Sequence, residues 1–194
     1  MEHTHEYVDL GLSVKWATCN VGATKPEEYG DYFAWGETTP KSTYDWETYK
    51  YCNGSFDSLT KYNNSSIFGT EDYKKTLELA DDAARANWGG SWRMPTRAEQ
   101  DELRKKCTWK WTTQNGVNGY IVTSKSNGNS IFLPAAGYRC DSPLYSAGSF
   151  GYYWSSSLYT DYPNGAYNLS FDSNSVDWVY YNRNLGFSVR PVCP

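Results

Sequence analysis

Histidine is almost absent from this chain, since the only two are His3 and His5. A Ser-His-Asp or Cys-His site needs an imidazole inside the fold, and a His-rich zinc site needs several. We expect both histidines to lie in a frayed N-terminal tail, so neither kind of site is predicted. Adjacent carboxylates such as Asp81 and Asp82 stay open as an acid–base pair, but they are more typical of a solvated face.

Long apolar runs and an excess of positive charge are also missing. No stretch approaches the ~18 apolar residues that a membrane-spanning helix needs. Residues 1–6 are polar, so we expect no signal peptide and no membrane insertion by this segment. The net charge of −4 argues against a nucleic-acid partner, because binding to phosphates depends on Lys and Arg.

Cysteine is sparse and odd in number. There are five residues, without a C-x-x-C pair: Cys19, Cys52, Cys107, Cys140 and Cys193. An odd count leaves at least one thiol free or paired with another chain. We interpret them as buried or incidental thiols, and their pairing stays open.

Aromatic residues and glycine are abundant instead. The 194 residues include 18 Tyr, 9 Trp and 16 Gly, and the mean hydropathy is −0.73. This length predicts one domain. Because aliphatic residues are scarce, Trp and Tyr must fill much of the core and also form amphipathic surfaces.

The hydrophobic pattern predicts an α+β fold. Apolar residues at steps of three and four indicate a helix over residues 73–88, with Thr70 as its N-cap. A T-x-x-E capping box at Thr96 and Glu99 begins a second helix, which continues to Lys106. Strands are expected at residues 7–19, 120–124, 130–135, 152–156, 166–171 and 186–192, and loops over residues 21–64.

Several segments resemble one family. Residues 92–99 (WRMPTRAE) are similar to a signature of C-type-lectin-like domains of the formylglycine-generating-enzyme kind. Further similarity is to FISUMP-type "major paralogous" domains of gut bacterial surface proteins, through residues 10–22, 31–37, 153–157 and 186–192. The resemblance implies a C-type-lectin-like fold over residues 1–194. There, the first and last strands pair, two helices flank the sheet, and a loop-rich half carries the ligand site.

The known activities of such folds are poorly supported by the residues. Calcium-dependent lectins carry E-P-N or Q-P-D, whereas residues 162–165 read YPNG and lack the acid before proline. Formylglycine-generating enzymes need two cysteines placed for oxidation, and neither Cys140 nor Cys193 lies in a comparable segment. We therefore expect no enzyme activity, no metal and no cofactor.

The last part of the chain lacks several ordinary residue types. Residues 138–194 contain no Lys, Glu, Gln or Met, whereas residues 1–137 contain 11, 10, 2 and 2 of them. Trp occurs there only as Trp154 and Trp178. Ser, Asn and Tyr suit exposed strands and turns, but this does not explain the loss of Lys and Glu, which are common on surfaces.

Codons whose first two bases vary while the third is fixed as C encode every residue type except Lys, Glu, Gln, Met and Trp. Scrambling the adenines of an Asn codon, AAC, gives this set. Diversity-generating retroelements overwrite the end of a target gene in this way, and their targets usually have C-type-lectin folds. We therefore predict a scaffold over residues 1–137 and a variable region over residues 138–194, with Trp178 and Arg183 as fixed positions.

The predicted ligand-binding residues form two main groups in C-terminal loops. They are Cys140, Asp141, Ser142, Pro143, Leu144, Tyr145, Ser146, Phe150, Asp172, Asn174, Asp177, Val179, Tyr180, Tyr181, Asn182, Asn184 and Leu185. Tyr gives rigid amphipathic contact area, and Ser, Asn and Asp give adaptable hydrogen bonds, as in antibody loops.

The sequence therefore predicts a non-enzymatic binding module on a cell surface or virion. Its partner would be a protein or glycan ligand on a host, cell or phage surface. Two alternatives stay open: a lectin-like adhesin with one fixed ligand and an oxidase of the formylglycine-generating kind.

Overall fold

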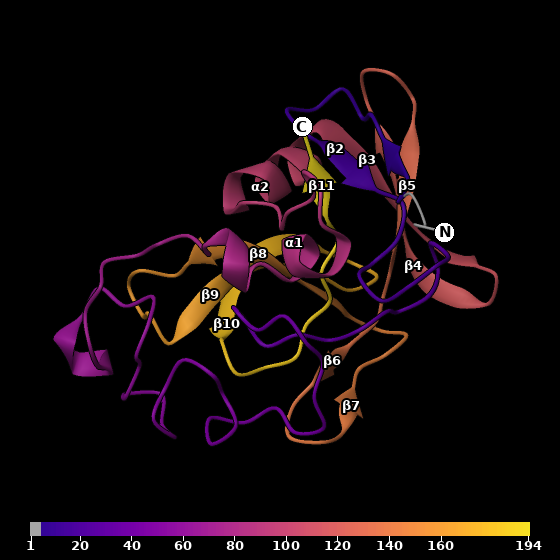
Figure 1. Cartoon of the computed structure of the whole chain (residues 1–194). Helices are drawn as coiled ribbons and strands as arrows, with labels where there is room; N and C mark the ends of the chain where they lie inside the picture. The colour runs from indigo at the N-terminus through magenta and orange to yellow at the C-terminus, as the bar shows by residue number, and fades with distance from the viewer. Residues whose placement is uncertain (1–4) are drawn as a thin grey trace.

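The computed structural model describes residues 5–194, and the prediction for His3 lies outside them. Within this range the fold is α+β, mostly strand, with two α-helices and four small antiparallel sheets (Figure 1). Two short 3-10 turns, Ser66–Phe68 and Leu79–Asp81, lie in the connecting segments.

The two ends of the described chain meet in one sheet. Strand β2 (Lys15–Ala17) lies between β1 (Tyr7–Val8) and β11 (Val192–Cys193). Both pairings are antiparallel, and Trp16 lies opposite both Val8 and Val192. The expected pairing of the first and last strands is therefore present, although the strand expected over residues 7–19 is two strands joined by a turn.

The second expected helix is confirmed as α2 (Arg97–Lys106). The Thr96 hydroxyl accepts a hydrogen bond from the Glu99 N–H, and the Glu99 carboxylate accepts one from the Thr96 N–H, which completes the capping box. Arg104, Lys105 and Lys106 follow in the last turn, where positive charge favours the helix dipole.

The first expected helix is much shorter than its apolar spacing predicts. Helix α1 covers only Ala83–Trp88, and its N-cap is Asp82 rather than Thr70. The segment before it is extended, because it pairs with β8: Leu77 N–H donates to the Ser156 carbonyl, and Leu158 N–H donates to Lys75. Sheet pairing has replaced the local helical preference.

A second sheet contains one strand that was not predicted. It consists of β3 (Cys107–Gln114), β4 (Val117–Ser124) and β5 (Ser130–Pro134). Strand β3 was missed, although Trp109 and Trp111 alternate with polar residues along it. Both indoles pack edge-on against Tyr120 of β4, so β3 covers one side of the core.

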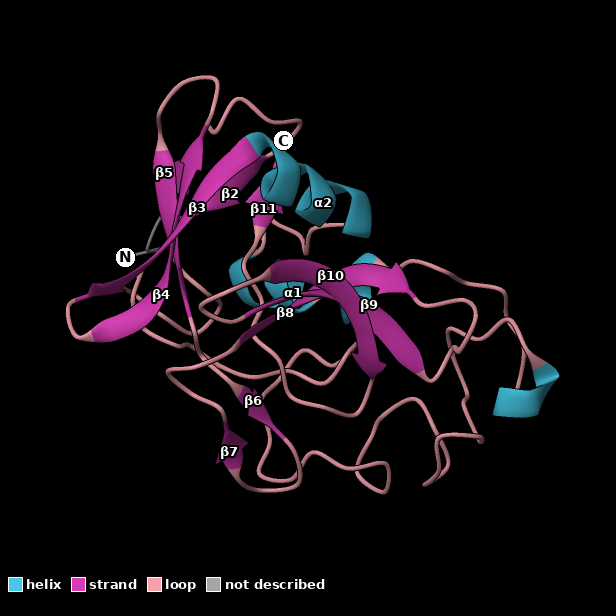
Figure 2. Ribbon diagram, turned by 180° about the vertical axis from the view of Figure 1, so that it is seen from behind, coloured by secondary structure: helices cyan, strands magenta, loops and turns pink. Residues whose placement is uncertain are grey.

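The predicted variable region, residues 138–194, supplies the strands of the two remaining sheets. Strands β6 (Tyr138–Arg139) and β7 (Leu144–Tyr145) form a hairpin, and β8 (Gly151–Leu158), β9 (Gly165–Phe171) and β10 (Val176–Asn182) form a three-stranded sheet in the order β10-β9-β8. Strand β10 corrects the expectation of a loop over residues 177–182. Helix α2 packs across this sheet (Figure 2).

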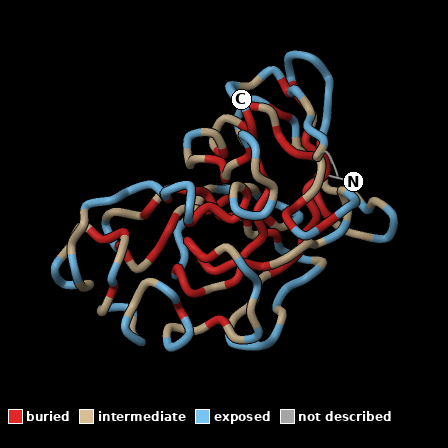
Figure 3. The backbone as a smooth tube through the Cα atoms, viewed as in Figure 1, coloured by how far each residue is buried: buried red, intermediate tan, exposed pale blue. Residues whose placement is uncertain are grey.

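Aromatic side chains fill the core, as the composition predicts. The largest buried groups include three indoles, those of Trp16, Trp35 and Trp154. Buried chain runs through the middle of the molecule, and exposed chain is concentrated in the outer loops (Figure 3). His5 belongs to this packing, since its ring stacks on Trp88 at 3.8 Å, so it does not lie in a frayed tail.

Candidate functional site

Strand β10 places successive predicted side chains on opposite faces of its sheet. Tyr181 lies on the face that carries Tyr152, and the two ring centroids are 5.7 Å apart. Tyr180 points to the other face and stacks on Tyr159 at 3.8 Å. Both tyrosines stay accessible, with 45% of Tyr180 and 42% of Tyr181 exposed.

A first aromatic cluster joins the two predicted segments. This "Tyr152 cluster" consists of Tyr138, Tyr145, Phe150, Tyr152 and Tyr181. Tyr145 of the hairpin stacks on Tyr138 at 5.5 Å, and Tyr138 meets Tyr152 edge-on at 5.2 Å. Residues that are far apart in sequence thus form one continuous aromatic surface. Burial raises the pKa of Tyr152 to about 12.

A second aromatic cluster lies around Tyr180. This "Tyr180 cluster" consists of Tyr159, Tyr162, Tyr167, Trp178 and Tyr180. A hollow of about 600 Å³ opens here, lined by most of the same rings and by Asp161, Val179 and Tyr181. Aromatic faces beside a carboxylate can stack on flat or cationic groups and accept hydrogen bonds.

Most of the predicted ligand-binding residues face water. The exposed ones are Asp141, Ser142, Pro143, Tyr145, Ser146, Phe150, Asn174, Asp177, Tyr180, Tyr181 and Asn182. The half-buried ones are Cys140, Leu144, Asp172, Val179 and Leu185.

The prediction that Asn184 binds ligand at the surface is wrong, because this residue is buried, with 7% of its surface exposed. Its amide donates to the Tyr44 carbonyl at 3.4 Å, so its side chain faces the interior loops. We leave Asn184 out of the candidate surface.

Arg183, next to Asn184, anchors the end of β10. Its guanidinium is fully buried and donates to the carbonyls of Lys61, Tyr62 and Pro163 at 2.7–2.9 Å and to the hydroxyl of Tyr49 at 3.0 Å. These acceptors come from two connecting segments, one that contains Tyr49, Lys61 and Tyr62 and one that contains Pro163. A single side chain therefore holds the loops beneath the Tyr180 cluster in place.

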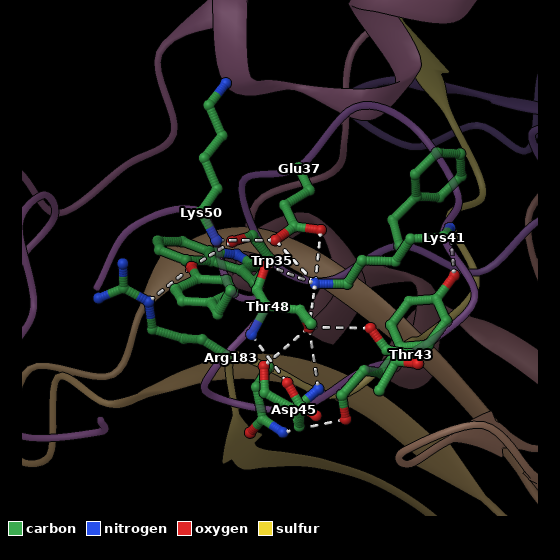
Figure 4. A network of polar contacts seen from close by, with 12 residues as sticks. Trp35, Glu37, Lys41, Thr43, Asp45, Thr48, Lys50 and Arg183 are labelled. Carbon is green, nitrogen blue, oxygen red and sulfur yellow. Dashed lines mark hydrogen bonds and ion pairs between the residues drawn. The ribbon is translucent and has the colours of Figure 1, made fainter. Parts of the chain in front are cut away.

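A polar network extends this anchor into the long N-terminal loop region (Figure 4). The Tyr49 hydroxyl, which accepts from Arg183, donates to the Trp35 carbonyl. The carboxylate of Glu37, itself buried, accepts from the Lys41 ammonium at 3.1 Å and from the Lys50 N–H at 3.0 Å. The segment over residues 21–64, which was expected to form loops, is thus held in place by buried polar contacts.

The cysteines are not arranged as a redox pair. All five are free in the structure. Cys140 follows β6 and Cys193 lies in β11, which Figures 1 and 2 place at opposite ends of the molecule. Burial, and then the carboxylate of Asp141, raises the pKa of the Cys140 thiol, which disfavours the nucleophilic thiolate.

One cysteine shares a surface hollow with a histidine, which the sequence did not predict. Cys19 and His5 line the same surface hollow, together with Glu6 and Trp88. Across residues 5–194, no cluster of three or more His, Cys, Asp or Glu side chains could hold a metal ion. No helix in that range is long and apolar enough to cross a membrane.

The sequence prediction missed several rings of both clusters. Tyr138, Tyr152, Tyr159, Tyr162 and Tyr167 were not predicted, although they contribute rings to this surface. A signal was present, because tyrosine recurs through residues 138–167. Tyr152 and Tyr167 were left out because they lie in expected strands rather than in loops.

A family model described as a domain of unknown function, DUF8237, matches residues 112–192. The match extends from β3 to β11 and so includes the whole candidate surface. No curated protein and no solved structure matches the chain.

Proposed function

We propose that the chain is a non-enzymatic recognition module of C-type-lectin-like fold with a diversified C-terminal binding surface. The observation that carries the proposal is the absence of Lys, Glu, Gln and Met from residues 138–194. Codons confined to N-N-C leave out these residue types, and the surface that results resembles an antibody combining site in composition.

The placement of the residues supports the proposal. Exposed positions such as Tyr145 and Tyr181 can change without altering the core, whereas Trp154 and Arg183 are fully buried. The paired ends, the two helices and the capping box at Thr96 fit the fold that the family resemblance implies.

The gene sequence tests the diversification. Codons for the exposed positions are expected to end in C or T and to differ from an Asn codon, AAC or AAT, only at the first two bases. The codons of buried framework residues such as Leu169 and Val189, which are free to end in A or G, serve as the control. A near-copy of this segment beside a reverse transcriptase gene is the second expected finding, and codons of any other kind at the exposed positions would refute diversification.

A fixed glycan ligand is the second candidate function. The observation that favours it is the Tyr180 cluster, in which stacked rings lie beside Asp161 in one hollow. A glycan array probed with the chain tests it, with Tyr180→Ala as the comparison. Binding of one sugar class that the substitution abolishes supports this candidate over a diversified surface. On either view, we propose that the module acts at a cell surface or on a virion.

A further inference from the structure

Strand β10 is a free edge of its sheet. It pairs only with β9, in unbroken register from Val176 opposite Phe171 to Asn182 opposite Gly165. Proteins commonly protect such edges with Lys, Pro or a bulge. Strand β10 has none of these features, since its sequence is VDWVYYN.

The backbone groups that face outward can be identified from two flanking hydrogen bonds. Asp172 N–H donates to the Ser175 carbonyl, and Arg183 N–H donates to the Asn164 carbonyl. Antiparallel pairs alternate between bonded and non-bonded residues. Residues 177, 179 and 181 therefore bond to β9, while Trp178 and Tyr180 direct their N–H and C=O groups away from the sheet. No other element among residues 5–194 pairs with β10.

The hollow beside the Tyr180 cluster lies along this edge. Its lining includes Trp178 and Tyr180 from one face of the strand and Val179 and Tyr181 from the other. A cavity on a single face would be lined by alternate residues only. The space of about 600 Å³ therefore reaches the edge of the strand itself.

The charges around the edge are mainly negative. Asp161 lines the hollow, Asp177 is exposed on β10, and the lining contains no cationic side chain. The nearby Arg97 already stacks on Trp178, 3.8 Å from the ring centroid, and on Tyr167. The remaining aromatic faces and the Asp161 carboxylate suit Lys or Arg side chains.

We propose that the free edge of β10 binds an extended, basic segment of a protein ligand by β-sheet addition. The inference rests on the recognition role proposed above and adds the chemical class of the ligand. Backbone hydrogen bonds to Trp178 and Tyr180 supply attachment, and the side chains around them supply selectivity. Such an edge suits a diversified surface, because every substitution except proline changes a side chain of β10 but leaves its N–H and C=O groups in place.

The test uses a phage-displayed library of random dodecapeptides selected on the full chain. Selected peptides are expected to be rich in Lys or Arg and to slow amide hydrogen exchange at Trp178 and Tyr180 about tenfold or more, with little change at Val179, whose amide is already bonded. Two N-methylated versions of a selected peptide test the pairing, because only every second residue of an added strand directs its N–H toward β10. Methylation of the nitrogens that face β10 is expected to abolish binding, and methylation of the alternate nitrogens is expected to preserve it.

A matched pair of variants separates backbone from side chain. Tyr180→Ala keeps the outward N–H, whereas Tyr180→Pro removes it at an edge position where proline is tolerated. The proline variant is expected to bind a selected peptide about tenfold more weakly than the alanine variant. The exchange experiment on the unaltered chain stands even where the proline variant does not fold.

Three results would overturn the inference. These are selection of no peptide, peptides that bind without slowing exchange at β10, and protection of β10 by concentration-dependent dimerisation alone. Peptides bound elsewhere would refute the edge site and leave the recognition function standing. If the codon test fails but peptides still bind along β10, diversification is refuted and the edge site stands.

Discussion

At the scale of single residues, tyrosine has two different roles in this chain. Tyr153 is fully buried, and its hydroxyl donates to the Pro134 carbonyl at 2.7 Å. Tyr181, in contrast, is 42% exposed, and its ring meets that of Tyr152 edge-on. Tyr is both rigid and amphipathic, which explains why composition alone could not separate framework from surface.

These two tyrosines give a direct comparison. Tyr153→Ser is expected to lower the free energy of unfolding by about 3–5 kcal/mol, because a large buried ring is lost. Tyr181→Ser is expected to lower it by less than about 1 kcal/mol, as is usual for surface positions. Urea unfolding measures both. A cost at Tyr181 equal to that at Tyr153 would show that Tyr181 belongs to the core.

Arg183 is expected to be the most sensitive charged position. Arg183→Met removes the donors for three buried carbonyls and one hydroxyl, so we expect a loss of about 3 kcal/mol or more in the free energy of unfolding. Arg139→Met is the control, since Arg139 is half-buried and its guanidinium donates to the Ser142 carbonyl and lies over the Tyr32 ring. Similar stabilities for the two variants would contradict an anchoring role for Arg183.

At the scale of elements, the sequence predicted α2 well and α1 poorly. The capping box at Thr96 and Glu99 is a local signal, and it marks the start of α2 correctly. Residues 73–82 carry an equally regular apolar pattern but are mostly extended. Their conformation depends on distant partners: the Leu77 N–H donates to Ser156 of β8, and the Asp72 carboxylate accepts from the N–H groups of Tyr62 and Asn63. A local pattern could not reveal such contacts.

The candidate site shows the same limit. Its exposed residues could be predicted, because loss of residue types is a property of the sequence itself. The alternating arrangement of β10 could not, because the segment was interpreted as a loop, and with it the free edge and the paired aromatic clusters were missed. Asn184 was misplaced for a related reason, since its burial depends on a contact with Tyr44, which is 140 positions away in the chain.

The cap of α2 provides a test at this scale. Thr96→Ala is expected to lower the free energy of unfolding by about 1 kcal/mol, because the Glu99 N–H loses its acceptor. Thr96→Ser keeps a hydroxyl and is expected to cost much less. Thermal or urea unfolding of the two variants checks this, and equal losses would show that the hydroxyl does not act as the cap.

At the scale of the whole molecule, several carboxylates couple stability to pH. Burial alone would raise the pKa of Asp81, but hydrogen bonds from Lys61, Tyr51 and Tyr62 hold it below its usual value. Burial opposes ionisation of Glu99 in the same way, and its ion pair with Arg93 lowers the pKa. The pKa of Asp82 is shifted in the opposite direction, since burial raises it.

The lowered pKa values of Asp81 and Glu99 predict that acid destabilises the folded chain. A carboxylate whose pKa is lower in the folded chain contributes stability above about pH 4, and this contribution is lost as pH falls through the folded pKa, because the unfolded chain then binds more protons. The free energy of unfolding is therefore expected to fall between about pH 5 and pH 2. Urea unfolding across this range measures it. Asp81→Asn is expected to flatten the slope, and an unchanged slope would contradict the role of Asp81.

The small sheet that joins the two ends of the described chain has a mechanical consequence. Because β1 and β11 both pair with β2, tension applied to the ends loads this sheet first. The β8–β9–β10 sheet carries no strand from either end, so it stays unstretched until the joint at β2 opens. Under such tension, the surface formed by the Tyr152 and Tyr180 clusters would therefore keep its shape up to the force at which that joint yields.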